Sequence, residues 1–290
     1  MIIRKWLSKV DCLLFCETPV RDDLLAIAHS MGIPSVCIVN WEWLAPYLPW
    51  VRDVDLFLAP NSHTYDLLTQ WKAKSLPRIK VERIPGLVDV DRFSFKERAV
   101  CRSFLFVNGR GGFAPTIRGL YRDRLGPPRK GLEVVLKAAR LAPEVPIKIR
   151  SQIPIENDLP ANVELLPSEE DNTKLYDTGD VAVQPSLLEG TGLQMIEMMA
   201  TGLPLITTNA PPMNEFPALD LIDCRSKLGK ARRHIIDVNF PSAAHLARLM
   251  QVRLGTSVVA ESRLSRQYVM EHHSWDALSE RFMDLFNQGR

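Results

Sequence analysis

The chain has 290 residues, of which 46% are hydrophobic and 24% are charged, and its net charge is +2. This length allows a sizeable core in one large or two modest domains, and the small net charge gives no reason to expect nucleic-acid binding. No apolar run approaches the roughly eighteen residues of a membrane span, and the first residues lack the apolar core of a signal peptide. The five cysteines form no CxxC pair, so neither a zinc knuckle nor a disulfide framework is indicated. We therefore expect a reduced, cytoplasmic protein without a transmembrane segment.

Strands and helices alternate from the beginning of the chain. Apolar runs bounded by turn residues predict strands at 11–17, 34–40, 54–60 and 80–85. Helical periodicity predicts helices at 20–32 and 62–72. A turn-rich connection at 86–95 ends this series.

A second series of the same kind opens at residue 103. Its strands are predicted at 103–109, 147–151, 181–186 and 203–208, and its helices at 130–142, 169–179 and 192–201. Alternation at this spacing predicts parallel sheets that helices cover on both faces. The break near residue 95 divides the chain into two α/β lobes, 1–94 and 95–264.

The segment EGTGLQMIEMMATGLP, 189–204, contains the most informative pair of acidic residues. Glu189 lies in the loop after a predicted strand, and Glu197 lies about one turn into the following helix. Gly190 and Gly192 let the backbone approach a ligand and leave amide donors free at the helix start. Carboxylates accept hydrogen bonds from vicinal hydroxyls, so this loop could hold a sugar. Alternatively, Glu189 caps the helix and Glu197 is solvated.

Basic residues are concentrated between 101 and 140. This segment has a net charge of +7, from nine basic residues and two acids, whereas the whole chain has +2. Two interpretations remain open, a solvated basic face and a site for an anion such as phosphate.

These motifs together resemble those of retaining glycosyltransferases of family 4, which have the two-lobed GT-B fold. The E-x7-E pattern is matched by Glu189-Gly190-Thr191-Gly192-Leu193 with Glu197, although Thr191 replaces the family's usual aromatic residue. The segments RIPGLVDVDRF, LFVNGRGG with RKGLEVVLKAARL, and LYDTGDVAVQPSLLEG follow the family's order. HHSWDALSERFMDLF resembles the closing helix, about 265–290, that crosses back to the first lobe. The resemblance spans about residues 11–285 and implies α/β, GT-B-like architecture with two Rossmann-like lobes.

The resemblance also implies roles for residues of the second lobe. Arg110 and Lys130 occupy the positions that clamp the donor diphosphate, beside Gly109. Glu197 would hold the nucleotide ribose, while Glu189 and the amides of Gly190, Thr191, Gly192 and Leu193 would hold the transferred sugar. Lys130 opens a predicted helix, where the dipole disfavours a cation, so an anion is expected to share the site. The loop between Gly109 and Lys130 is about twice the usual length, and which arginine of 110–129 is the clamp stays open.

The first lobe is shorter than the family's and lacks a counterpart of its opening half. Asn40 occupies the position of the family's active-site histidine, and Glu42 is the nearest ionisable residue. An amide can hydrogen-bond a sugar but cannot act as a base. Trp43 belongs to an aromatic cluster at 41–50 that either packs at the lobe junction or forms an acceptor platform facing sugar or lipid.

We therefore expect a retaining hexosyltransferase that uses a UDP- or GDP-linked sugar and needs neither cofactor nor metal. No candidate nucleophile for a double displacement is evident, which favours front-face transfer. The expected acceptors are a glycan, a lipid-linked group or a protein, with peripheral membrane contact and a homo-oligomer or partner chain covering the open sheet edge. The alternatives are a catalytically weak nucleotide-sugar-binding or partner subunit and a sugar-nucleotide epimerase. Lys130→Ala is expected to weaken donor binding more than stability.

Overall fold

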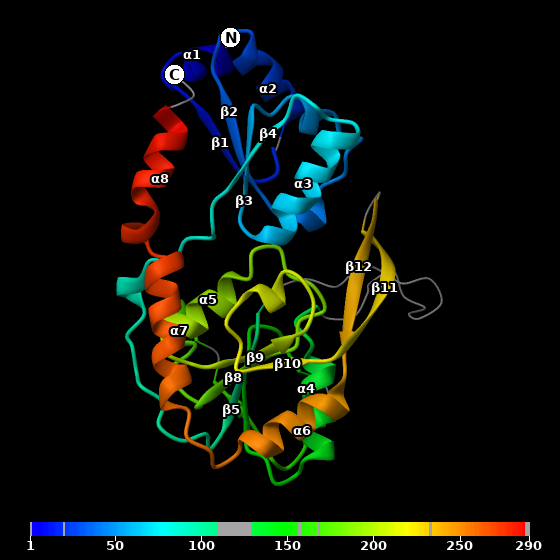
Figure 1. Ribbon diagram of the computed structural model, residues 1–290, viewed down its shortest axis with the longest axis vertical. Coiled ribbons are helices and arrows are strands. Elements are labelled where there is room, and N and C mark those ends of the chain that lie inside the picture. The colour runs from blue at the N-terminus through cyan, green and yellow to red at the C-terminus, as the bar shows by residue number, and fades with distance from the viewer. Residues whose placement is uncertain are drawn as a thin grey trace. The chain divides into compact units, whose positions relative to one another are not determined.

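The computed structural model describes residues 2–19, 21–109, 129–155, 158–167, 169–231 and 234–287 (Figure 1). Its contacts divide the chain into two compact units. Unit 1 consists of Met1–Gly86 with Leu278–Arg290, and unit 2 consists of Leu87–Ala277. The divisions expected from the sequence were at 94/95 and 264/265.

Unit 1 is built on a parallel sheet of four strands in the order β1-β2-β3-β4. Its elements are α1 (Ile2–Leu7), β1 (Leu13–Glu17), α2 (Asp22–His29), β2 (Ser35–Val39), β3 (Leu56–Ala59), α3 (Ser62–Lys74), β4 (Lys80–Arg83) and the end of α8 (Trp275–Asn287). β1 buries Leu13 and Phe15 but exposes Leu14, as expected for a strand with one covered face. The core joins these residues to Leu25 and Phe57.

Unit 2 contains a six-stranded parallel sheet in the order β10-β9-β8-β5-β6-β7. Its strands are β5 (Phe104–Asn108), β6 (Ile147–Ser151), β7 (Val163–Leu166), β8 (Val181–Gln184), β9 (Leu205–Thr208) and β10 (Asp220–Ile222). Its helices are α4 (Leu132–Leu141), α5 (Leu193–Ala200), α6 (Ala243–Arg253), α7 (Val259–His272) and the start of α8. The strands predicted at 103–109, 147–151, 181–186 and 203–208 and the helices predicted at 130–142 and 192–201 are confirmed, whereas β7 and β10 were not predicted.

Helices cover both faces of the unit 2 sheet. Phe104 and Phe106 of β5 belong to a core with α4 and α6, whereas Leu105 and Val107 belong to a core with α5 and α7. Alternating side chains of one central strand therefore serve two separate cores, which explains why the whole strand is apolar. The parallel strands end at one common edge of the sheet, where helices α4 and α5 begin.

A hairpin and one helix of unit 2 also differ from the sequence-based expectation. β11 (Cys224–Ala231) and β12 (His234–Pro241) form an antiparallel hairpin that was not predicted. The helix expected at 169–179 is wrong, because only a 3-10 turn, Asn172–Lys174, forms there. Asp171 accepts hydrogen bonds from the backbone nitrogen and the hydroxyl of Thr173, and such local bonds compete with a helix.

α5 carries much of the E-x7-E segment and has clear ends. Gly192 is its N-cap residue, with a φ of 79° that favours glycine. At the other end, Leu203 N donates to Met198 O and Gly202 N donates to Met199 O, the pattern of a Schellman motif. The helix therefore begins and ends where the sequence predicted.

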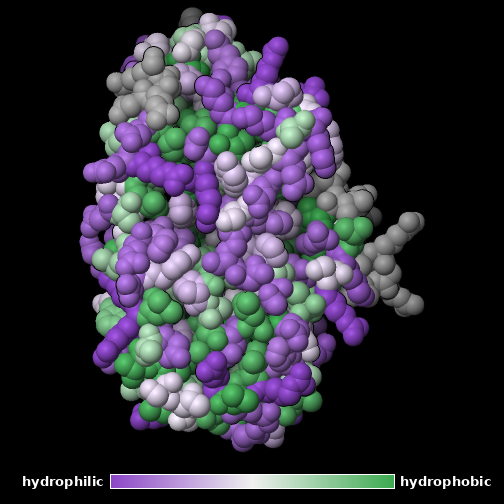
Figure 2. All heavy atoms as spheres, in the orientation of Figure 1, coloured by the Kyte–Doolittle hydropathy of each residue, from purple (hydrophilic) through white to green (hydrophobic). Residues whose placement is uncertain are grey.

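The surface shows mixed hydropathy on the face drawn in Figure 2, where hydrophilic side chains surround smaller hydrophobic groups. Over the described ranges, no helix combines the length and apolar character needed to cross a membrane.

Candidate active site

The residues expected to bind the donor meet at the carboxyl edge of the unit 2 sheet. Gly109 directly follows β5, and Glu189 lies in the loop between β8 and α5. Lys130 precedes the N-cap of α4, and Glu197 lies one turn into α5. Ligands of open parallel sheets usually bind at this edge, near helix N-termini.

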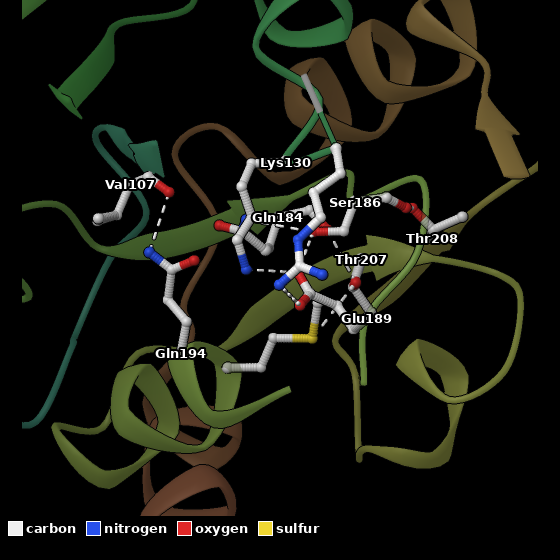
Figure 3. Close-up of polar contacts among 10 residues, drawn as sticks. Val107, Lys130, Gln184, Ser186, Glu189, Gln194, Thr207 and Thr208 are labelled. Carbon is white, nitrogen blue, oxygen red and sulfur yellow. Dashed lines mark hydrogen bonds and ion pairs between the residues drawn. The ribbon is translucent and has the colours of Figure 1, made fainter. Parts of the chain in front are cut away.

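Glu189 and Lys130 form a buried ion pair. Lys130 Nζ donates to Glu189 Oε1 over 2.7 Å, and the two side chains are only 9% and 5% exposed. Ser186 Oγ donates to the same oxygen over 2.7 Å, and Arg129 Nη2 lies 4.0 Å from Glu189 Oε2. In Figure 3 the labelled side chains of Lys130, Ser186 and Glu189 converge. The site therefore combines one carboxylate with two cationic side chains.

Electrostatics keeps Glu189 ionised in spite of its burial. Burial alone would raise the pKa of Glu189, but the charges of Lys130 and Arg129, with hydrogen bonds from Lys130 and Ser186, hold that pKa below its ordinary value. An anion was expected near Lys130 because the dipole of α4 disfavours a cation at its start. Glu189 is that anion, so the protein itself supplies it. The position of Lys130 in the sequence is therefore no independent evidence for a phosphate.

Glu197 is held by a buried tyrosine. The Tyr176 hydroxyl donates a short hydrogen bond to Glu197 Oε2, and Tyr176 is 1% exposed. Burial raises the pKa of Glu197, although this hydrogen bond and nearby cations act in the opposite direction. The pKa of Tyr176 is raised well above its ordinary value by burial and by the adjacent carboxylate, so its proton stays on the phenol. Glu197 is consequently an oriented carboxylate, not a freely solvated one.

A cavity of about 200 Å³ lies beside these groups. Its lining includes Gly109, Arg129, Lys130, Gln194 and Glu197, together with Gln152, Asn172, Leu175 and Tyr176. Ser186, Tyr176 and Gln194 were not predicted from the sequence as site residues, whereas Arg129 belongs to the range 110–129 in which the clamping arginine was left open. Tyr176 and Ser186 stand in the matched motif LYDTGDVAVQPSLLEG, which was the available signal.

Several predicted site residues stand apart from this cluster or cannot be placed. Arg110, with Arg118, Arg122 and Arg124, lies outside the described residues, whereas Arg129 lies at the site. The side chain of Leu193 is 46% exposed, and the donor-binding role predicted for this residue concerns its backbone amide. Gly190 is buried and Thr191 is half-buried in the loop before α5.

The three residues expected on the acceptor side lie in unit 1. Asn40 follows β2, and its amide donates to Glu17 Oε1 over 3.3 Å. Glu42 is buried and Trp43 is half-buried in the 3-10 turn Trp41–Trp43. Their role toward an acceptor stays a prediction.

The two carboxylates are expected to affect stability in opposite directions as pH changes. Because the pKa of Glu197 is raised in the folded state, protonated Glu197 stabilises the protein. This contribution to stability is fully present below pH 4.5, the ordinary pKa of the group, and is lost as pH rises through the folded-state pKa. Because the pKa of Glu189 is lowered in the folded state, ionised Glu189 stabilises the protein. This contribution to stability is fully present above pH 4.5 and is lost as pH falls through the folded-state pKa. Glu197→Gln should therefore stabilise the protein at pH 7, and the gain should shrink toward pH 4.

Urea denaturation at both pH values measures this effect, with Glu189→Gln as the matched control, which should destabilise at pH 7. A Glu197→Gln protein that is less stable than the wild type at pH 7 would show that the ionised carboxylate belongs to the folded state's favourable interactions.

The sequence model of a known family matches part of this region. Residues 120–218 match the family described as "Glycosyl transferases group 1", which covers Lys130, Glu189 and Glu197 but only about a third of the chain. No curated protein matches the sequence.

Solved structures resemble nearly the whole chain. The crystal structure of the GtfA/B complex matches with a TM-score of 0.66 at 13% identity, covering 99% of this chain and 60% of that one. Anabaena Alr3699/HepE in complex with UDP and glucose matches with a TM-score of 0.63 at 12% identity, covering 99% of this chain and 81% of that one. A glycosyltransferase from Rickettsia africae matches with 0.66 at 13% identity, covering 99% and 79%.

These likenesses establish the fold. The chain has a GT-B-like α/β architecture with parallel sheets, which confirms the predicted fold class. The chain spans about three fifths of the chain matched in the GtfA/B complex.

Proposed function

We propose that this chain is a glycosyltransferase of the retaining family 4 type, which transfers a hexose from a UDP- or GDP-linked sugar to an acceptor. The observation that carries the proposal is the buried Lys130–Glu189 pair, because Lys130 lines one cavity at the carboxyl edge of the sheet together with Arg129 and Glu197. The family match over 120–218 supports it. In this proposal Lys130 and Arg129 bind the diphosphate, Glu189 orients the transferred sugar and Glu197 holds the ribose.

The proposed reaction needs stabilisation of negative charge on the leaving diphosphate. The bond from the anomeric carbon to the phosphate oxygen breaks, and the acceptor hydroxyl oxygen forms a bond to the same carbon. The acceptor's proton passes to the leaving phosphate on the same face of the sugar. Cationic side chains fixed in a water-poor site stabilise the developing charge without reorganising.

Glu189 suits an orienting role better than that of a nucleophile. Its carboxylate already accepts hydrogen bonds from Lys130 and Ser186 on one oxygen, and Arg129 lies near the other. A carboxylate with a lowered pKa and bound cations is a weak nucleophile. This arrangement supports front-face transfer over double displacement.

The direct test is release of nucleoside diphosphate from a panel of UDP- and GDP-sugars. Turnover, even to water, is expected, and the released or transferred sugar should keep its anomeric configuration. Tight donor binding without turnover would support the second candidate, a nucleotide-sugar-binding subunit. Asn40 favours that candidate, because an amide bonded to Glu17 cannot act as a base.

Activity is expected to survive EDTA. Lys130 and Arg129 supply at the cavity the positive charge that a divalent ion would otherwise supply to the diphosphate. Initial rates measured before and after chelation should agree. Loss of turnover in EDTA that Mn²⁺ restores would contradict this assignment of the two cations.

The remaining features of the proposal concern the setting of the reaction. We place the protein in the cytoplasm, with a glycan, lipid-linked or protein acceptor and a homo-oligomer or partner chain as further expectations. Light scattering with crosslinking measures the assembly state.

A further inference from the structure

Helix α5 presents a second hydrogen-bond acceptor to the cavity besides Glu197. Gln194 precedes Glu197 by three residues, and side chains at this spacing lie on one face of a helix, about one turn apart. Both residues line the same cavity. The first turn of α5 therefore contributes an amide next to the carboxylate.

The amide of Gln194 is held in one orientation. Its Nε2 donates to the carbonyl oxygen of Val107 over 3.0 Å, as Figure 3 shows. Because a backbone carbonyl can only accept, this bond assigns the nitrogen to the Val107 side and leaves the oxygen as the remaining acceptor. Gln194 Oε1 is buried and has no hydrogen-bond partner within the described part of the chain. A buried acceptor in this state calls for a donor from a ligand or from water.

Gly109 leaves space beside this acceptor. A Cβ atom at Gly109 would lie 3.5 Å from Gln152 Oε1, 3.7 Å from Gln194 Nε2 and 4.0 Å from Gln194 Oε1. Two glutamine amides thus border the volume that the missing side chain leaves open. A ligand that lies against the backbone of Gly109 comes within reach of Gln194.

The charges of the cavity indicate which part of a ligand meets Gln194. Arg129 and Lys130 are donors and suit phosphate oxygens, which only accept. Gln194 Oε1 and Glu197 are acceptors and would oppose a phosphate, but they suit neighbouring hydroxyl groups. A nucleoside diphosphate has both features, a diphosphate and a vicinal diol on its ribose.

We propose that Gln194 Oε1 accepts a hydrogen bond from one ribose hydroxyl of the donor nucleotide while Glu197 accepts from the other. Gln194 is thereby a specificity-determining residue that selects ribonucleotides over deoxyribonucleotides. This inference rests on the proposed function and adds a residue to the donor site.

Calorimetric titration of the whole chain with UDP, 2′-deoxy-UDP and 3′-deoxy-UDP tests it, with the guanosine series used if GDP binds more tightly than UDP. One of the two deoxynucleotides lacks the hydroxyl that Gln194 holds. Wild-type protein should bind it about tenfold more weakly than the ribonucleotide, because one hydrogen bond is lost and a buried acceptor is left unpaired. Gln194→Leu should bind the ribonucleotide at the level of that deoxynucleotide and lose the discrimination. Gln194→Glu keeps an acceptor oxygen at this position, so this variant should still discriminate between the ribonucleotide and the deoxynucleotide.

Gln267→Leu on α7 is the matched control, because it removes a glutamine whose amide bonds to Glu271 on the same helix. Thermal unfolding of each variant establishes that it is folded. Undiminished discrimination in folded Gln194→Leu would overturn the inference but leave the proposed function standing. Absence of binding of both UDP and GDP to the wild-type protein would overturn both.

Discussion

Replacing Lys130 with alanine is expected to cost both donor binding and about 3–5 kcal/mol of stability. The side chain of Glu189 is 5% exposed and its oxygen lies 2.7 Å from Lys130 Nζ. Removing the ammonium group leaves a buried carboxylate without its nearest counter-charge, and Arg129 at 4.0 Å compensates only in part. The structure therefore changes the expectation from sequence, which assigned the loss mainly to the donor. Loss of one charge-assisted contact should also weaken donor binding roughly ten- to a hundredfold.

Urea denaturation separates the two effects when the partner is neutralised as well. Lys130→Met should be strongly destabilised, and Lys130→Met combined with Glu189→Gln should recover much of the lost stability because no buried charge remains unpaired. Nucleoside diphosphate release should stay low in the double variant. A double variant no more stable than Lys130→Met would show that the ion pair is not the source of the cost.

Gly131→Ala is the second substitution expected to have a large effect. Gly131 has a φ of 85°, and a Cβ atom there would lie 2.1 Å from the carbonyl oxygen of Pro185. That distance is shorter than any non-bonded contact between carbon and oxygen, so the loop that carries Lys130 or the backbone after β8 must move. We expect a loss of about 1–3 kcal/mol beyond the strain of the positive φ itself. Displacement of Lys130 should lower donor turnover on the order of a hundredfold.

Gly255→Ala provides the matched control within unit 2. Gly255 has a φ of 80°, but no atom of the described residues lies within 4 Å of the added Cβ, so its substitution reports the backbone strain alone, about 1–2 kcal/mol. Equal denaturation midpoints for the two variants would mean that the overlap with Pro185 costs no stability, which would contradict the expected loss at Gly131.

Much of the fold could be predicted because its strands are short apolar runs between glycine, proline and asparagine. β5 is the clearest case, since every residue of Phe104–Asn108 is buried. The hairpin β11–β12 was missed because its first strand is basic, with Arg225 and Lys227 exposed, and carries no strong apolar alternation. The helix at 169–179 was wrong because propensity could not show that Asp171 would bond to Thr173.

The site was predictable as a set of residues but not as a set of contacts. The spacing of Glu189 and Glu197 placed one acid in the loop and the other in the helix, as the structure has them. That Glu189 pairs with Lys130, which lies 59 residues away, depends on how the loops after two strands meet at the sheet edge. The role of Tyr176 was hidden for the same reason, because its partner Glu197 lies 21 residues further on.

A crystal structure of the whole chain with a bound nucleoside diphosphate tests the central claim most directly. The diphosphate is expected within hydrogen-bond distance of Lys130 and Arg129, and the ribose hydroxyls are expected within hydrogen-bond distance of Glu197 and Gln194. A nucleotide bound away from this cavity, with the Lys130–Glu189 pair untouched, would contradict it.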